Sequence, residues 1–369
     1  MKAVGITPRK PHTARLVELP EPKVGEVPNG RGVKVKILKV GVDGTDKELH
    51  LGEYGAPPPG YDFLVTGHEC FGQVVEVGPK VKEFKRGDFV VPTVRRPGGS
   101  LFDTIGTYDM TSEETYYERG INLRHGYLTE YFVDDPEYLV KVPKGLQHIA
   151  ILLEPMSICI KGILQAYEIN RRLKVWKPSR VAVMGAGPIG LLTALAYRIR
   201  NLETVVFGVE KRPYRNAELL DEIGATYYSV QDRPLAEEVK KNGPFDMVFE
   251  ATGFSPVVFD AMSALAKNGA LILSSVTGGH RKCEVEADRL NIEFVLGNKV
   301  MFGTVNAHRG YFEEGLKDFA MSEAAYPGWL TKLLSHPVDG LENWKEQIRI
   351  LFEIKDCTKA YLNVAQPEA

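Results

Sequence analysis

The chain has 369 residues, of which 25% are charged and 9% aromatic, and its formal net charge is -2. This length exceeds what one ordinary hydrophobic core organises, so we expect two domains in a soluble globular enzyme. The balanced charge argues against nucleic acid or a membrane surface as a partner. No secretory apolar region follows Met1 and no apolar run approaches the length of a membrane span, so we expect a cytoplasmic protein.

The first part of the chain is predicted to consist of short β-strands. Residues 33–40 alternate apolar and polar side chains with a period of two, which is typical of a half-buried strand. Similar strands are predicted at residues 73–77, 88–94, 127–133 and 138–142. Turns rich in glycine and proline separate them, which indicates a barrel-like β domain. Residues 98–124 lack periodicity, and we expect a long loop there beside the active site.

Three segments of this part place ionisable side chains beside glycine or proline and apolar sequence. His68 and Glu69 stand in Gly67-His68-Glu69-Cys70-Phe71-Gly72, Asp43 stands in a glycine-flanked acidic segment, and Glu154 closes an apolar run. An Asp, a His and a Glu from separate segments could converge on one metal ion. Three nitrogen and oxygen ligands with one open position are typical of catalytic rather than structural zinc. The alternative is a barrel turn in which His68 is a surface or core histidine.

The cysteines show no pattern of a metal site or a disulfide framework. No C-x-x-C spacing occurs among Cys70, Cys159, Cys283 and Cys357. We therefore expect four buried, reduced thiols.

The second part of the chain contains a dinucleotide-binding pattern. Residues 179–184 read as a buried parallel strand, which runs into Gly185-Ala186-Gly187-Pro188-Ile189-Gly190 and an apolar helix at 191–197. The first glycine makes the tight turn, the second lets a pyrophosphate approach the backbone, and the third lets helix and strand pack closely. Strand, glycine motif and helix in this order predict a nucleotide site.

Strands and helices alternate after this motif. Further strands are predicted at residues 204–209, 246–250, 269–275 and 300–305, and helices at 158–167, 217–223, 257–267 and 344–352. Alternation of this kind predicts a doubly wound α/β sheet.

The run from Gly67 to Val90, with Gly78 and Gly87-Asp88 after the histidine, resembles the zinc signature of the medium-chain alcohol dehydrogenase superfamily. The resemblance implies a GroES-like β-barrel catalytic domain plus a Rossmann doubly wound parallel sheet. The implied boundaries are 1–167 for the catalytic domain, 168–308 for the dinucleotide-binding domain and 309–369 for a C-terminal segment that returns to the catalytic domain.

Within the superfamily the chain is similar to the archaeal glucose dehydrogenases, particularly the halophilic branch. The likeness is most specific in Gly41 to Asp46, Pro92 to Pro97, Glu118-Arg119-Gly120 and Val305-Asn306. The cysteines of the structural zinc lobe found in many members are missing, so we expect one zinc ion. The acidic surface typical of halophiles is absent too.

The resemblance assigns the metal to Asp43, His68 and Glu154, with Glu69 as an additional or alternative ligand. Asp43 stands where most relatives carry a cysteine, and an all nitrogen and oxygen site could also accept manganese or cobalt. Asp46 would orient His68 through its other ring nitrogen.

Thr45 matches the hydroxyl that accepts the substrate proton. The histidine that often ends this relay is replaced by Glu48, with His50 further along, so the proton exit stays open. The alternative is a purely structural role, in which Thr45 is a helix N-cap and Glu48 closes a capping box.

The implied substrate is an aldose such as glucose, oxidised at C1 to its lactone. The substrate contacts carried over by the resemblance are Thr45, Glu118, Glu154 and Asn306. A polyol or secondary-alcohol dehydrogenase is the alternative within the superfamily. Zinc-free quinone reductases of the same fold are disfavoured by the metal residues, and a catalytically dead homologue is a third reading.

The implied cofactor is a nicotinamide dinucleotide. Its expected contacts are Gly185, Gly187, Pro188, Ile189, Gly190, Glu210, Lys211, Arg212, Ser275, Thr304 and Asn306. Glu210 follows the second strand of the nucleotide fold, where a carboxylate binds the ribose hydroxyls of NAD and repels a 2′-phosphate. Lys211, Arg212 and Arg215 keep NADP open. We also expect a homo-oligomer, a dimer or tetramer.

Overall fold

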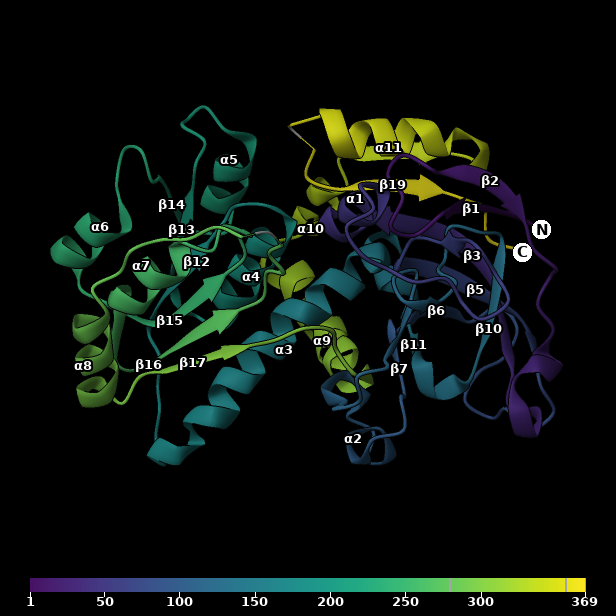
Figure 1. The fold of residues 1–369 in the computed structure, drawn as a ribbon, viewed down its shortest axis with the longest axis horizontal. Helices are drawn as coiled ribbons and strands as arrows, with labels where there is room; N and C mark the ends of the chain where they lie inside the picture. Colours follow the sequence, from purple (N-terminus) through teal and green to yellow (C-terminus); the bar gives the residue numbers. More distant parts are fainter. Residues whose placement is uncertain (279, 356, 369) are drawn as a thin grey trace. The chain divides into compact units, whose positions relative to one another are not determined.

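The computed structural model describes residues 1–278, 280–355 and 357–368 (Figure 1). The chain forms two compact units. Unit 1 contains Met1–Glu154, Asn306–Phe319 and Leu330–Ala369, and unit 2 contains Pro155–Val305 and Ala320–Trp329. Most of the segment after Asn306 therefore belongs to the same unit as the N-terminal strands. As functional domains, the ranges 1–167, 168–308 and 309–369 stay a prediction.

The largest sheet of unit 1 joins strands from both ends of the chain. Its strands are β3 (Val33–Val42), β5 (Glu69–Val77), β6 (Phe89–Pro92), β10 (Tyr131–Asp134), β11 (Leu139–Lys141), β18 (His336–Asp339) and β19 (Ala360–Asn363). They follow the order β11-β6-β5-β3-β19-β18, and β10 also pairs with β3. Figure 1 shows the yellow C-terminal strand β19 beside the purple strands near the N-terminus.

Strand β3 is central because its apolar residues lie inside. Val33, Val35, Ile37 and Val40 are fully buried, as the period-two pattern predicts. The C-terminal return is tied to this strand by more than β19. The helix α11 (Trp344–Glu353) buries Gln347, whose Nε2 donates to the Val40 carbonyl at 3.2 Å.

Two small sheets complete unit 1 together with short helices. One sheet is β2 (Arg15–Glu18), β1 (Lys2–Ile6) and β4 (Leu64–Val65), and the other is β7 (Arg95–Arg96), β8 (Tyr117–Arg119) and β9 (Leu123–Arg124). The helices are α1 (Gly44–His50), α2 (Leu101–Thr104), α9 (Arg309–Ala325) and α10 (Trp329–Leu333), the last two shared with unit 2 along the chain.

Residues 98–124 are more ordered than the predicted long loop. They contain α2, a 3-10 turn at Tyr108–Met110, and the strands β8 and β9. Asp103 organises the first turn, because its Oδ2 accepts backbone N–H groups from Gly98, Gly99 and Ser100 at 2.7–3.0 Å. The absence of apolar periodicity concealed these elements, which are held by local polar contacts and by pairing with β7.

Unit 2 is a six-stranded, all-parallel sheet. Its strands are β12 (Arg180–Met184), β13 (Glu203–Gly208), β14 (Thr226–Ser229), β15 (Phe245–Glu250), β16 (Leu265–Leu273) and β17 (Val300–Gly303). The order β14-β13-β12-β15-β16-β17 is that of a doubly wound dinucleotide fold, which confirms the predicted sheet type. Its helices are α3 (Leu153–Asn170), whose first two residues belong to unit 1, α4 (Pro188–Arg198), α5 (Arg215–Glu222), α6 (Leu235–Asn242), α7 (Val257–Ala264) and α8 (Ala287–Gly297).

Several element predictions in unit 2 are corrected. The helix predicted at 257–267 ends at Ala264, and Leu265 begins β16, because pairing with Phe245 draws this residue into the sheet. The strand β14 was not predicted, since its four residues, Thr226 to Ser229, are mostly polar. The helices α6 and α8 were also missed.

One helical stretch is longer and more apolar than the sequence analysis assumed. Lys144–Leu173 is long and apolar enough to cross a membrane by length and composition, so the expectation that no run approaches a span was wrong there. However, 83% of its most apolar window is buried inside the protein. Burial of this kind is typical of a core helix.

The prediction of four buried thiols holds for two cysteines. All four are free, and Cys70 and Cys159 are buried, whereas Cys357 is half-buried and Cys283 is exposed. The prediction for Cys283 was wrong because this residue lies in an irregular segment before α8 rather than in a core element.

Candidate active site

The predicted metal residues of unit 1 begin with Asp43, which caps helix α1. Its Oδ1 accepts the backbone N–H groups of Thr45 at 2.8 Å and Asp46 at 3.4 Å. The Asp46 side chain reciprocates by accepting from the Asp43 N–H at 3.2 Å, so the capping box runs from Asp43 to Asp46. The alternative reading of Thr45 as N-cap, with Glu48 closing the box, was therefore wrong. Asp43 Oδ2 lies 3.5 Å from His68 Nε2.

His68 follows a turn that only glycine accommodates easily. Gly67 has φ +84°, and a side chain there would meet Val40 and Leu128 at under 3.0 Å. The imidazole of His68 is 4% exposed, and its Nδ1 has no hydrogen-bond partner in the described chain. Asp46 Oδ2 lies 3.7 Å from this nitrogen, beyond hydrogen-bonding distance. Asp46 thus lies where the sequence analysis placed it, but its orienting role stays a prediction.

Glu69 forms a buried ion pair that the sequence did not reveal. Its carboxylate contacts the ammonium of Lys359, and both side chains are almost completely buried. The registers of β3 with β5 and with β19 explain the encounter, since Gly41 pairs with Glu69 on one side and with Tyr361 on the other. A Cβ at Gly41 would lie 2.0 Å from Glu69 Oε2, so glycine is required for this approach.

These side chains form two overlapping groups that could hold a metal ion. One group is Asp43, Asp46 and His68, and the other is His68, Glu69 and Glu154; within each, one ligand atom per residue lies within 4.8 Å of the others. His68 belongs to both. Each residue predicted as a ligand therefore lies in a group with His68, but Asp43 and Glu154 lie in different groups, and their sharing of one metal ion stays a prediction. The donor set is one imidazole and several carboxylates, which suits zinc and also manganese or cobalt.

The charges of the cluster favour a cation. Burial raises the pKa of Glu154 to about 8 and that of Asp46 to about 6. Burial also acts to lower the pKa of His68, but the carboxylates of Asp43 and Asp46 outweigh it and hold that pKa well above its usual value. Carboxylates confined around one imidazole gain from a positive charge among them. The orphaned His68 Nδ1 and this carboxylate excess are the observations that fit a metal ion.

Thr45 stands in the first turn of α1 and is linked to a tyrosine. Burial, followed by the charge of Glu48, raises the pKa of Tyr54, whose hydroxyl lies near the side chains of both Glu48 and Thr45. The sequence analysis missed Tyr54, although it lies only a few residues beyond the capped helix. His50 is buried, and burial, followed by the nearby His12, lowers its pKa to about 4, so its imidazole is neutral near pH 7.

The predicted sugar-binding residues Glu118 and Asn306 are in contact, and an arginine joins them. Glu118 Oε1 accepts from Arg95 Nε at 3.1 Å and Nη2 at 2.8 Å, and also from the Asn306 amide. All three side chains are buried, and the Arg95 guanidinium lies 4.7 Å from the centre of the Tyr116 ring. All of these hydrogen bonds use Oε1, which leaves Oε2 available to another donor. The Arg-Arg pair before Pro97 was the one signal that could have indicated Arg95.

The glycine turn of unit 2 has the form required of a phosphate-binding turn. β12 runs into Gly185, and α4 begins at Pro188 with Gly187 as its N-cap. A Cβ at Gly190 would lie 2.0 Å from the Gly185 carbonyl oxygen, whereas nothing lies within 4 Å of a Cβ at Gly187. Gly187 is exposed, and Pro188 and Ile189 are half-buried, so the N-terminus of α4 is accessible. Its free N–H groups are suited to an anion.

Glu210 lies just past the carboxyl end of β13 and is exposed. The basic residues after it are paired with acids. Lys211 contacts Asp232, and Arg212 makes a two-pronged ion pair with Asp221 at 2.7 and 2.8 Å. Their positive charge is therefore partly compensated within unit 2.

Two more predicted cofactor contacts lie near the ends of neighbouring strands. Ser275 and Thr304 are half-buried, and the Thr304 hydroxyl has no hydrogen-bond partner in the described chain. Thr304 N–H donates to the Leu273 carbonyl at 2.9 Å, which continues the pairing of β16 with β17. Asn306 belongs to unit 1, unlike the other predicted cofactor residues.

Comparison with known proteins connects both units to one family. The family described as "Glucose dehydrogenase C-terminus" matches residues 147–349, and the "Alcohol dehydrogenase GroES-like domain" matches residues 29–144. A glucose 1-dehydrogenase of Methanocella arvoryzae is 40% identical over 362 residues, covering 96% of this chain and 99% of the relative. One of Thermoproteus tenax is 35% identical over 346 residues, covering 94% and 95%.

A solved structure gives the same result. The glucose dehydrogenase of Haloferax mediterranei, solved in complex with NADP, Zn and gluconolactone, has a TM-score of 0.87 and 33% identity, covering 99% of this chain and 100% of the relative. Together with the GroES-like match, it confirms the predicted fold class of a Rossmann sheet plus a GroES-like β domain.

The two glycines of the turn should respond differently to a methyl group. Gly190→Ala should lower the thermal unfolding midpoint, because the methyl would overlap the Gly185 carbonyl. Gly187→Ala should leave the midpoint of the dinucleotide-free protein within about 2 °C. It should weaken dinucleotide binding at least about tenfold, because the pyrophosphate must approach this backbone closely. Differential scanning fluorimetry and NADH fluorescence measure the two effects, and equal midpoints for both variants would contradict the assignment.

Proposed function

Because the chain belongs to the glucose dehydrogenase family of the medium-chain alcohol dehydrogenase superfamily, we propose that it oxidises an aldose such as glucose at C1 to the lactone. The reaction transfers a hydride to a nicotinamide cofactor and depends on a metal ion. The observation that supports this proposal is the His68-centred cluster of unit 1, in which two groups of carboxylates, Asp43 with Asp46 and Glu69 with Glu154, share the His68 imidazole. We assign catalysis to the range 1–167, nucleotide binding to 168–308, and the return to the catalytic domain to 309–369.

The residues that would hold the metal are Asp43, His68 and Glu154, with Glu69 as a further or alternative ligand. When bound, a zinc ion supplies Lewis-acid chemistry, which lowers the free energy of removing a proton from an alcohol oxygen. One ion is proposed, without a second structural zinc. The helix cap on Asp43 Oδ1 directs Oδ2 toward His68, and Lys359 holds Glu69 in place through their ion pair.

Thr45 is proposed to hold the proton released from the sugar C1 hydroxyl at its Oγ1. The Tyr54 hydroxyl, which lies near both Thr45 and Glu48, offers a path for this proton away from the site. The path ends at a carboxylate and replaces the histidine of the usual relay. The neutral, buried His50 is poorly suited to be the acceptor.

Removing the carboxylate of Asp43 should strip the metal. Asp43→Ala should abolish both metal content and turnover while NADH binding stays intact, because the glycine turn lies in unit 2. Alanine also removes the N-cap, worth about 1 kcal/mol. Asp43→Ser keeps a capping oxygen but no carboxylate, and should lose the metal equally. Elemental analysis and NADH fluorescence measure the outcome, with exposed Asp62→Ala as control. Full activity of Asp43→Ser would remove Asp43 from the site.

The cofactor is proposed to be NAD, with NADP as a second acceptor. Exposed Glu210 supports NAD, and the ion pairs of Lys211 and Arg212 reduce their attraction for a 2′-phosphate. The Haloferax relative was solved with NADP, which keeps dual use open for this chain.

Steady-state kinetics with both cofactors tests the role of Glu210. We expect kcat/KM for NAD to equal or exceed that for NADP. Glu210→Gln should raise kcat/KM for NADP about fivefold or more, because a like-charge contact at about 4 Å costs about 1 kcal/mol even in water. Glu237→Gln, an exposed change elsewhere in unit 2, should change neither value. A wild-type enzyme that strongly prefers NADP would overturn the NAD assignment.

The sugar is proposed to bind between Thr45, Glu118, Glu154 and Asn306. Buried polar groups that match sugar hydroxyls reject simple alcohols, because such alcohols leave them unpaired. Glu118 is suited to this role, since Arg95 and Asn306 fix one oxygen while Oε2 can accept a hydroxyl. A homo-oligomer and a cytoplasmic location stay predictions.

Glu118→Gln should lower kcat/KM for glucose, galactose or xylose at least about tenfold while cofactor affinity barely changes, since a charge-assisted hydrogen bond contributes about 2 kcal/mol. Glu118→Gln also weakens the ion pair with Arg95, and a change in local structure from that loss would lower kcat/KM as well. The double variant Arg95→Leu with Glu118→Gln removes both charges and should stay impaired if Glu118 binds sugar. Exposed Glu114→Gln is the control. Recovery in the double variant, or faster oxidation of sorbitol than of any aldose, would replace the sugar assignment by the polyol reading.

A further inference from the structure

The strand that the sequence did not predict, β14, carries polar side chains that reach the end of β13. The two strands pair in parallel, and they lie side by side in Figure 1. Side chains two residues apart lie on the same face of a strand. Tyr227 and Ser229 therefore share one face of β14, and both are buried, whereas Tyr228 lies on the opposite face.

Residues of β14 and of the turn after it hold two carbonyl groups at the end of β13. The Gly208 carbonyl accepts the Val230 N–H at 2.8 Å. The Val209 carbonyl accepts from Gln231 Nε2 at 2.7 Å and from Ser229 Oγ at 3.3 Å. Because Gly208 is the last residue of the strand, side chains replace the sheet ladder as the partners of the Val209 carbonyl.

Tyr227 holds the next carbonyl group, that of Glu210. Its hydroxyl donates to this oxygen at 2.6 Å. A Cβ at Gly208 would lie 2.6 Å from the same hydroxyl, so the missing side chain of Gly208 leaves room for it. Burial, followed by the neighbouring Tyr214, raises the pKa of Tyr227 to about 12, so the hydroxyl keeps its proton near pH 7 and acts as the donor.

These contacts continue to the glycine turn of the nucleotide fold. The ring centres of Tyr227 and Tyr214 lie 5.6 Å apart. The side-chain amide of Asn216 donates to the Tyr214 hydroxyl at 3.1 Å and to the Ala186 carbonyl, inside the turn, at 2.8 Å. One set of contacts within unit 2 therefore holds both the backbone of the turn and the backbone that carries Glu210.

The position of the Glu210 carboxylate decides how well it can select a cofactor. Glu210 is exposed and lies outside any helix or strand. The repulsion between its charge and a 2′-phosphate falls as their separation grows. Hydrogen bonds to the ribose hydroxyls of NAD also require close and well-aligned oxygens. Both effects therefore depend on a backbone that is held in place at this residue.

We propose that Tyr227 is a positioning residue for cofactor selection, whose hydroxyl fixes the Glu210 backbone so that the Glu210 carboxylate favours NAD over NADP. This inference rests on the proposed role of Glu210 as the residue that selects NAD. The hydroxyl acts through the backbone, since its proton is donated to the Glu210 carbonyl. The role accounts for polar side chains on a buried face of β14.

Fluorescence titration of the metal-loaded enzyme with NADH and with NADPH tests the role without requiring turnover. The readout is the Kd for NADPH divided by the Kd for NADH. Tyr227→Phe should lower this ratio at least about threefold, which is the size of effect expected from one lost hydrogen bond. Tyr228→Phe is the matched control and should keep the wild-type ratio, because the Tyr228 hydroxyl makes no hydrogen bond among the described residues.

Partial loss of folded protein does not imitate the expected result. With the nucleotide in excess, a Kd does not depend on the fraction of the protein that is inactive, and the ratio compares two ligands on one preparation. A general weakening of the nucleotide site would raise both Kd values together and leave the ratio at its wild-type value. That outcome would contradict the proposal.

The double variant Tyr227→Phe with Glu210→Gln tests whether the hydroxyl acts through the carboxylate. If it does, adding Tyr227→Phe to Glu210→Gln should change the ratio by less than about 1.5-fold. An equal effect of Tyr227→Phe in both backgrounds would overturn the positioning role while leaving Glu210 as the selecting residue. A wild-type ratio in Glu210→Gln alone would instead remove Glu210 from cofactor selection, and the role of Tyr227 with it.

Discussion

The confinement of several carboxylates around one imidazole is the constraint on which unit 1 depends. Asp43, Asp46, Glu69 and Glu154 surround His68, with Lys359 as a buried cation against Glu69. Such a cluster is costly to bury unless each charge is held and compensated. The helix cap fixes the Asp43 carboxylate, and the tight turn at Gly67 fixes the position of His68. A metal ion would compensate the remaining negative charge.

The same sheet brings these groups together from distant parts of the chain. β3 ends beside Asp43 and lies between β5, which carries Glu69, and β19, which follows Lys359. The missing side chain of Gly41 leaves room for the Glu69 and Lys359 pair. The C-terminal strand is therefore part of the site's support.

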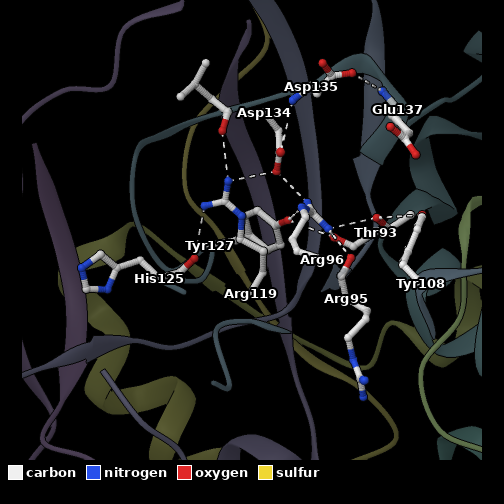
Figure 2. Close-up of polar contacts among 11 residues, drawn as sticks. Thr93, Arg95, Arg96, Tyr108, Arg119, His125, Tyr127, Asp134, Asp135 and Glu137 are labelled. Atoms are coloured by element: carbon white, nitrogen blue, oxygen red, sulfur yellow. Dashed lines mark hydrogen bonds and ion pairs between the residues drawn. The ribbon is translucent and has the colours of Figure 1, made fainter. Parts of the chain in front are cut away.

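Buried arginines form ion pairs with carboxylates elsewhere in unit 1. Arg95 has one carboxylate partner, Glu118, whose second oxygen is open to a ligand. Arg96 and Arg119 instead share Asp134 (Figure 2). Unit 2, by contrast, presents a glycine turn and a helix N-terminus, which bind through the backbone.

The sequence by itself determined the features that depend on patterns among neighbouring residues. The period of two predicted β3, and the order of strand, glycine motif and helix predicted the nucleotide fold, because backbone geometry depends on nearby residues. The motifs around Asp43, His68 and Glu154 predicted metal ligands, and the structure places each of them in a group that contains His68. The tertiary structure decided which buried charges pair: Lys359 with Glu69, Arg95 with Glu118, and Arg96 and Arg119 with Asp134. It also gave β14 and the elements within residues 98–124, which lack an apolar period. The physical reason is that ion pairs and strand registers join residues far apart in the chain, and no spacing in the sequence encodes which distant charge will compensate a buried one.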